Sequence, residues 1–71
     1  MGILYNRLLI ILNDSDLGST DYHIAMIMLQ NMHRLAGLSI QQLANLCNVS
    51  KSTISKFIRE LGYEDFADFR D

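Results

Sequence analysis

The chain has 71 residues, 49% of them apolar and 20% charged, with a net charge of −2 and one cysteine. This length supports one domain with a small core, since two cores would each bury too little surface. The single cysteine, Cys47, excludes an intramolecular disulfide, and the separation of His23 and His33 excludes the common zinc spacings. We therefore expect no metal and no cofactor. No apolar run is long enough to cross a bilayer, so we expect a cytoplasmic domain.

Charge is distributed unevenly along the chain. Residues 22–59 contain no Asp or Glu, and the acids lie before and after this stretch. Its four basic side chains are Arg34, Lys51, Lys56 and Arg59. Ordinary protein surfaces mix both signs, so a stretch of 38 residues without a carboxylate favours a polyanionic partner.

Two helices are predicted in the first half of the chain. Apolar residues recur at helical spacing and predict a helix over residues 2–13. Gly18-Ser19-Thr20 offers a cap for a second helix, with Asp21 in its first turn, and this helix should end before Gly37. Residues 24–29 are apolar almost all round, which predicts burial on several sides, either in the core or against another subunit.

Three further helices are predicted from capping signals. Ser39 and Gln42 form a capping box for a short helix over Ile40–Cys47. Another helix starts at Ser50 and stops at Gly62, and a last turn or two covers residues 64–69. The expected fold is therefore all-α, a compact five-helix bundle. Only nine residues follow Gly62 and they are predicted to be helical, so we expect no wing.

The third and fourth predicted helices have the spacing of a helix-turn-helix. Two helices that cross steeply after a short turn need a small contact residue, which Ala44 supplies, and a turn residue that tolerates a left-handed conformation, which Asn48 supplies. The residues expected to pack this motif together are Leu43, Ala44, Cys47, Asn48, Val49, Ile54 and Phe57.

The opposite face of the fourth helix is entirely polar or cationic, as a DNA major groove requires. Short hydroxyl side chains beside Lys51 could read base edges, and Lys56 and Arg59 could contact phosphates. With the two capping serines added, the candidate DNA-binding residues are Ser39, Ser50, Lys51, Ser52, Thr53, Ser55, Lys56 and Arg59.

The segment SIQQLANLCNVSKSTISKFIRELGYEDFADFR resembles the amino-terminal helix-turn-helix of the RpiR-type bacterial transcription regulators, which respond to phosphosugars. The likeness extends over nearly the whole chain. Its most specific part is the ending, Leu61-Gly62-Tyr63 followed by Phe66 and Phe69.

The resemblance implies a double-stranded DNA-binding domain, spanning residues 1–71, of a regulator of sugar or amino-sugar metabolism. It also implies a carboxy-terminal sugar-isomerase-type domain, absent from this chain, that drives homodimerisation and binds the phosphosugar effector. We therefore expect the chain to be part of a longer repressor or activator rather than a protein that acts alone.

Three positions depart from the pattern of that family. Asn48 replaces the usual turn glycine, Met32 stands where a proline commonly ends the second helix, and Ile54-Ser55-Lys56-Phe57 replaces an aliphatic-aliphatic-Arg-Phe run. The first change is conformationally tolerable, the second leaves the end of the second helix open, and the third affects which bases are read.

Other functions receive less support from the sequence. The alternative function is a helical protein-interaction module, antitoxin-like or adaptor, that uses the apolar second helix. No nucleophile–base pair, carboxylate dyad or phosphate-binding loop is recognisable, so we expect no enzymatic activity. Cys47 is expected to be a small buried apolar residue, and His23 and His33 to lie at the surface or at helix ends.

Overall fold

A computed structural model describes residues 2–70, and these residues form helices without any strand. The α-helices are α1 (Ile3–Asp14), α2 (Thr20–Gln30), α3 (Ile40–Cys47), α4 (Lys51–Glu60) and α5 (Phe66–Arg70), and a 3-10 helix, η1, covers Met32–Gly37. The all-α class is confirmed. The difference from the expected five helices is the additional 3-10 helix.

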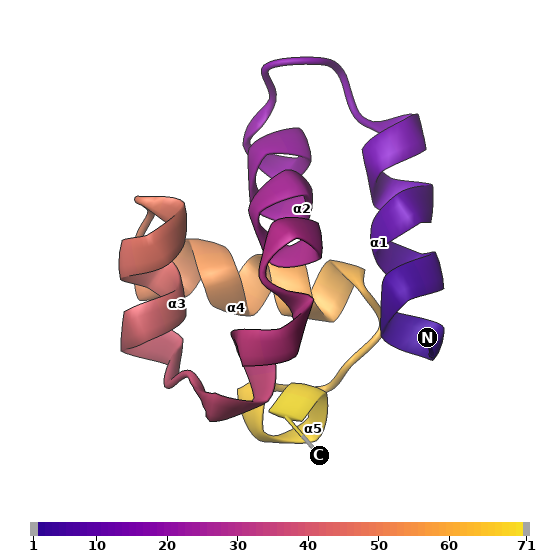
Figure 1. Cartoon of the computed structure of the whole chain (residues 1–71). Coiled ribbons are helices and arrows are strands. Elements are labelled where there is room, and N and C mark those ends of the chain that lie inside the picture. The colour runs from indigo at the N-terminus through magenta and orange to yellow at the C-terminus, as the bar shows by residue number, and fades with distance from the viewer. Residues whose placement is uncertain (1, 71) are drawn as a thin grey trace.

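The helices pack around α2 (Figure 1). α1 and α2 lie side by side and antiparallel, α1 forms one edge of the molecule, and α3 lies at the opposite edge. α4 crosses behind α2, and α5 closes the end of the molecule below α4. The Cα atoms extend over 27 × 25 × 21 Å.

The core takes at least one side chain from each helix. Its fully buried members include Leu8 from α1, Met28 from α2 and Phe57 from α4. Ile24, Ala25 and Met28 of α2 are all 0% exposed and lie on one side of that helix, and Met26, Ile27 and Leu29 on its other sides are half-buried. The apolar run of the second helix is therefore fully buried on one side and partly covered on the others by this chain, which weakens the interaction-module alternative.

α2 ends at Gln30, before Gly37 as expected, but the segment between these residues was not predicted as a separate helix. The backbone leaves the helical conformation at Asn31, with φ −125° and ψ 24°. Its side-chain Nδ2 donates to the Ile27 carbonyl at 2.8 Å, so a carbonyl of the last turn keeps a partner. Asn31 thus ends the helix without the proline that stands nearby in the resembling family.

The predicted caps are confirmed. Ser19 Oγ accepts from the Tyr22 amide at 3.1 Å. At the start of α3, Ser39 Oγ accepts from the Gln42 amide at 3.1 Å, and the Ser39 amide donates to Gln42 Oε1 at 2.9 Å. Ser50 Oγ accepts from the Thr53 amide at 3.1 Å. Because these signals are local in sequence, they predict the helix starts to within a residue or two.

The chain after α4 folds back onto α1. Gly62 has a φ of +105°, and the guanidinium of Arg7 lies against it and over the Tyr63 ring, 5.0 Å from the ring centroid. Tyr63 meets Phe69 edge to face at 5.5 Å between centroids. The Leu-Gly-aromatic ending is therefore a packing unit that holds α4, α5 and α1 together.

None of the helices within residues 2–70 combines the length and the apolar character that a membrane crossing needs.

Candidate nucleic-acid interface

α3 and α4 are joined by a tight turn that fixes the geometry of the helix-turn-helix. Asn48 adopts the left-handed conformation, with φ 61° and ψ 43°. The Asn48 amide donates to the Asn45 carbonyl at 3.1 Å, and the Val49 amide donates to the Ala44 carbonyl at 3.0 Å. These two bonds are the Schellman pattern, which satisfies carbonyls at the end of α3 and redirects the chain into α4.

Most of the residues expected to pack the motif lie in its interior. Ala44 is 0% exposed, and α3, to which it belongs, packs against α4. Val49 is half-buried, and Asn48 is exposed because the left-handed turn directs it to solvent. The remaining packing residues are all buried, namely Leu43, Cys47, Ile54 and Phe57.

α4 presents four of the candidate DNA-binding side chains to solvent. Lys51, Ser52, Lys56 and Arg59 are exposed, and the buried side of the helix carries Ile54, Phe57 and Ile58. The helix is thus divided lengthwise into an apolar side that holds it in place and a cationic, hydroxyl-bearing side that faces outward.

The hydroxyls of Ser50 and Thr53 are occupied with one another. Their Oγ and Oγ1 atoms lie 2.9 Å apart, in addition to the cap bond from the Thr53 amide. Thr53 and Ser55 are half-buried, so they are less accessible to a ligand than Ser52. Among Ser52, Thr53 and Ser55, Ser52 therefore has the most solvent-accessible hydroxyl.

Ser39 lies at the other end of the motif. It caps the start of α3, so the eight residues of that helix, about 12 Å at 1.5 Å per residue, separate it from the turn. The structure does not bring Ser39 together with the cluster on α4.

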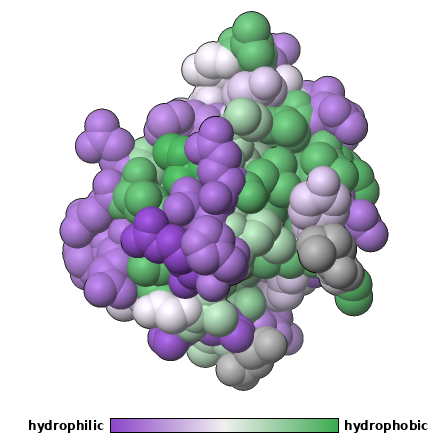
Figure 2. All heavy atoms as spheres, viewed as in Figure 1, coloured by the Kyte–Doolittle hydropathy of each residue, from purple (hydrophilic) through white to green (hydrophobic). Residues whose placement is uncertain are grey.

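The outer face of α3 is polar and was not identified from the sequence as part of the surface. Gln41 Nε2 donates to Asn45 Oδ1 at 3.0 Å, and both side chains are exposed. Figure 2 shows hydrophilic residues gathered on the side of the molecule where α3 lies, and hydrophobic residues toward α1. The i, i+4 spacing of Gln41 and Asn45 was the available signal.

Two carboxylates lie close together at α4: the sequence placed Glu60 on this helix, but it did not predict Asp21 beside it. Asp21 from α2 and Glu60 from α4 line a hollow of about 300 Å³ together with Lys56. Partial burial raises the pKa of Glu60, the charge of Asp21 and a hydrogen bond with it raise the pKa further, and Lys56 lowers it. The acid-free stretch therefore does not produce an acid-free surface, because its two neighbouring acids meet in space.

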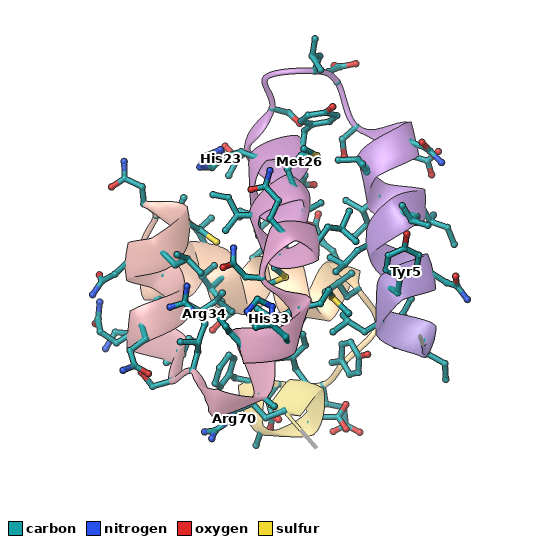
Figure 3. All side chains as sticks on the ribbon, viewed as in Figure 1. Tyr5, His23, Met26, His33, Arg34 and Arg70 are labelled. Atoms are coloured by element: carbon teal, nitrogen blue, oxygen red, sulfur yellow. The ribbon has the colours of Figure 1, made fainter. Side chains whose placement is uncertain are left out.

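His23 forms a hydrogen bond between α2 and the end of α3, which was also not predicted from the sequence. Its Nε2 donates to the Cys47 carbonyl at 3.0 Å, and Figure 3 shows the side chain leaving α2 on the side where α3 lies. Cys47 itself is 0% exposed, and burial raises the pKa of its thiol to about 11, which keeps the thiol protonated at neutral pH.

Comparison with known proteins agrees with this geometry. The family model described as "Helix-turn-helix domain, rpiR family" matches residues 6–71. The chain is 36% identical over 56 residues to the HTH-type transcriptional regulator GlvR of Bacillus subtilis (strain 168). The matched segment covers 79% of this chain and 22% of that protein. No solved structure matches the chain. The chain belongs to the rpiR family of helix-turn-helix domains.

Proposed function

We propose that this domain binds double-stranded DNA sequence-selectively as the amino-terminal domain of a transcription regulator. The observation that carries this proposal is the outward side of α4, where Lys51, Ser52, Lys56 and Arg59 are exposed beside a helix-turn-helix turn. A helix with short polar and cationic side chains fits the major groove, and its cations neutralise backbone phosphates.

The residues on α4 are assigned different roles. Lys56 and Arg59 contact phosphates, which fixes the position of the domain on DNA without selecting a sequence. Ser52 and Lys51, near the start of α4, read base edges, and the Ser50–Thr53 pair holds that end of the helix rigid. Ser55, half-buried between Lys51 and Arg59 on the same side of α4, is a further candidate contact, and Ser39 is a separate candidate at the start of α3.

The wider activity follows from the family and belongs to the same proposal. The chain spans 22% of the length of GlvR, so effector binding and dimerisation are proposed for the remainder of a longer protein. We assign that protein a cytoplasmic, non-enzymatic role in regulating sugar or amino-sugar metabolism through a phosphosugar, as a homodimer. The isolated domain should bind DNA weakly, because one small module makes few phosphate contacts and no second copy binds the other half-site with it.

Binding by fluorescence anisotropy, with a duplex enriched from a random library by the domain, tests the assignment. Lys56→Ala and Arg59→Ala should each weaken binding to enriched and random duplexes alike and reduce the salt slope by roughly 1, because each removes one phosphate contact. Ser52→Ala should mainly reduce the preference for the enriched duplex, and Thr53→Ala should act in the same direction.

Arg70→Ala is the matched control, since Arg70 lies on α5 over the Phe66 ring and belongs to neither helix of the helix-turn-helix. It should leave both affinities unchanged. Equal loss of sequence preference in the Lys56, Arg59 and Ser52 variants would contradict the division of roles, and absence of salt-dependent binding would contradict the function.

A further inference from the structure

The loop between α1 and α2 presents a leucine to solvent. Leu17 is 82% exposed, the highest value among the large apolar side chains of residues 2–70. The Ser19 amide donates to the Asp16 carbonyl at 3.0 Å, which closes a β-turn, and Gly18 has a φ of +93°, as type II turns require at their third residue. Figure 2 shows a hydrophobic group at the top of the molecule, where Figure 1 places this loop.

An apolar groove lies beside this leucine. Its volume is about 440 Å³, and its apolar lining comes from Leu17, Tyr22 and Met26 together with Val49, which follows the turn of the helix-turn-helix. Tyr22, Met26 and Val49 are half-buried, so part of each remains open to a ligand. Figure 3 shows Met26 on α2 below the loop. The loop therefore offers a partner one side chain to enclose and one groove to fill.

The segment around the loop carries only negative charges among its Asp, Glu, Lys and Arg residues. Residues 8–33 contain Asp14, Asp16 and Asp21 and no Lys or Arg. Asp14 and Asp16 are exposed and close to Leu17 in the chain, whereas Asp21 lines the separate hollow that contains Lys56. The apolar surface of the loop is thus bordered by two exposed carboxylates.

These carboxylates determine which partner fits the surface. DNA and anionic lipid headgroups would place phosphates against them, and like charges repel. A two-fold contact with a second copy of this domain would bring the same carboxylates together. A polypeptide that carries Lys or Arg beside an apolar side chain matches both the charge and the groove.

We propose that Leu17 and the adjacent groove, together with Asp14 and Asp16, form a docking surface for a cationic segment of a partner protein that also carries apolar side chains. An apolar side chain of the partner enters the groove, and its Lys or Arg side chains lie next to the two carboxylates. Because the β-turn already fixes the loop, docking costs this domain little conformational entropy. The surface differs from the apolar run of α2, since its central side chain belongs to the loop.

The docking surface lies next to α4. Thr20 lines the groove, and it also lines the hollow that contains Thr53 and Lys56 of α4. A partner docked at the loop is therefore held close to DNA bound on α4. Only this consequence rests on the proposed function, because docking itself needs no DNA.

Peptide display tests the docking surface without DNA. A library of short random peptides is selected on the immobilised domain and then depleted on the Leu17→Gln variant, so that the survivors are peptides that require Leu17. We expect the survivors to carry a net positive charge and at least one large apolar side chain. One loop and one groove form a small contact, so a synthetic survivor should bind with a Kd in the micromolar range.

Anisotropy titrations of a synthetic survivor separate the apolar and charged contributions. Leu17→Gln should weaken binding at least about tenfold, because it removes an apolar side chain that the partner buries. Asp16→Asn should weaken binding about two- to fivefold and reduce its salt dependence, because it removes one exposed ion pair.

Two variants outside the loop make matched changes. Ile3→Gln removes another exposed apolar side chain, at the start of α1, and Glu64→Gln removes another exposed carboxylate, after α4. Both should leave peptide affinity unchanged, and circular dichroism verifies that every variant is folded. Amide chemical-shift changes caused by the peptide should concentrate at residues 16–26 and at Val49.

Four outcomes would overturn the proposal. They are depletion that leaves no survivor, survivors without net positive charge, equal weakening by Leu17→Gln and Ile3→Gln, and shift changes concentrated away from the loop. None of them depends on whether the domain binds DNA, so failure of the docking surface and failure of the DNA-binding function are measured separately.

Discussion

Asn48 and Gly62 end α3 and α4 in the left-handed region of backbone conformation, with φ of 61° and +105°. After α4, the Gly62 amide donates to the Arg59 carbonyl and the Tyr63 amide donates to the Ile58 carbonyl, at 3.0 and 3.2 Å. The same bond pattern closes α3. The two positions differ in side chain, because asparagine tolerates this conformation at some cost and glycine at none.

Substitutions at Asn48 should isolate the conformational energy of the turn, since its side chain is exposed. We expect Asn48→Ala to lower the free energy of unfolding by about 1 kcal/mol, and Asn48→Gly to leave it unchanged or raise it slightly. Urea unfolding followed by circular dichroism measures both. A stabilising alanine would show that the turn does not require the left-handed conformation.

Gly62 is restricted by space as well as by φ. A Cβ at this position would lie 3.2 Å from Arg7 Nη1, so Gly62→Ala must strain the backbone and shift the Arg7 guanidinium by a few tenths of an ångström. We expect the free energy of unfolding to fall by about 1–2 kcal/mol.

Gly37→Ala is the matched control, because a Cβ there meets no atom within 4 Å. It should leave stability unchanged or raise it by up to about 1 kcal/mol. Similar melting temperatures for the two alanine variants would contradict the importance of the Gly62 contact.

At the scale of elements, α3 packs against α4, and we expect the small side chain of Ala44 to set how closely they approach. This residue is 0% exposed, and its carbonyl accepts the Val49 amide that begins the turn. The orientation of the exposed side of α4 therefore depends on a small side chain on α3.

Ala44→Leu should push α3 and α4 apart. We expect the free energy of unfolding to decrease by about 1–3 kcal/mol through overpacking, and binding to the enriched duplex to weaken as α4 is displaced. Ala67→Leu, on the exposed side of α5, controls for the added side chain and should leave the melting temperature almost unchanged. An unaltered melting temperature for Ala44→Leu would mean that the helices do not meet at this residue.

The charge of the whole molecule is arranged less simply than its sequence indicates. Asp21 and Glu60 come from opposite ends of the acid-free stretch and meet beside Lys56 on the flank of α4. Because partial burial and Asp21 raise the pKa of Glu60, the native state binds a proton at this carboxyl more readily than the unfolded chain does. Glu60 therefore contributes stability at a pH below 4.5, the ordinary pKa of a glutamate. This contribution is lost as the pH rises through the raised pKa of Glu60 in the native state.

Glu60→Gln should remove this loss. The difference in free energy of unfolding between Glu60→Gln and the unmodified domain should increase as the pH rises from below 4.5. It should reach a plateau above the pKa that Glu60 has in the native state. The variant should also bind DNA more tightly at neutral pH, since one negative charge beside Lys56 is gone. Thermal melts between pH 3.5 and 7.5 and anisotropy titrations measure the two effects.

Glu64→Gln makes the same charge change after α4, outside the hollow that Glu60 shares with Asp21. Its stability relative to the unmodified domain should vary less with pH. A difference between Glu60→Gln and the unmodified domain that stayed constant over this range would rule out the coupling with Asp21.

The starts of the helices and the identity of the motif were determined by the sequence. Ser19, Ser39 and Ser50 cap the helices they were expected to cap, and α3 covers Ile40–Cys47 as predicted. A cap depends on residues three or four positions apart, so its geometry is encoded locally. The apolar spacing likewise identified the buried sides of α3 and α4.

Tertiary structure alone decided which distant residues meet. It brought Asp21 to Glu60, His23 to the Cys47 carbonyl and Arg7 to Gly62, and it buried Ile24, Ala25 and Met28 of α2 while leaving Ile3 and Ile10 of α1 exposed. Each of these contacts joins elements far apart in the chain, and their approach depends on how the helices pack rather than on local propensity. For the same reason, the sequence predicted a basic stretch, whereas the fold placed two carboxylates beside it.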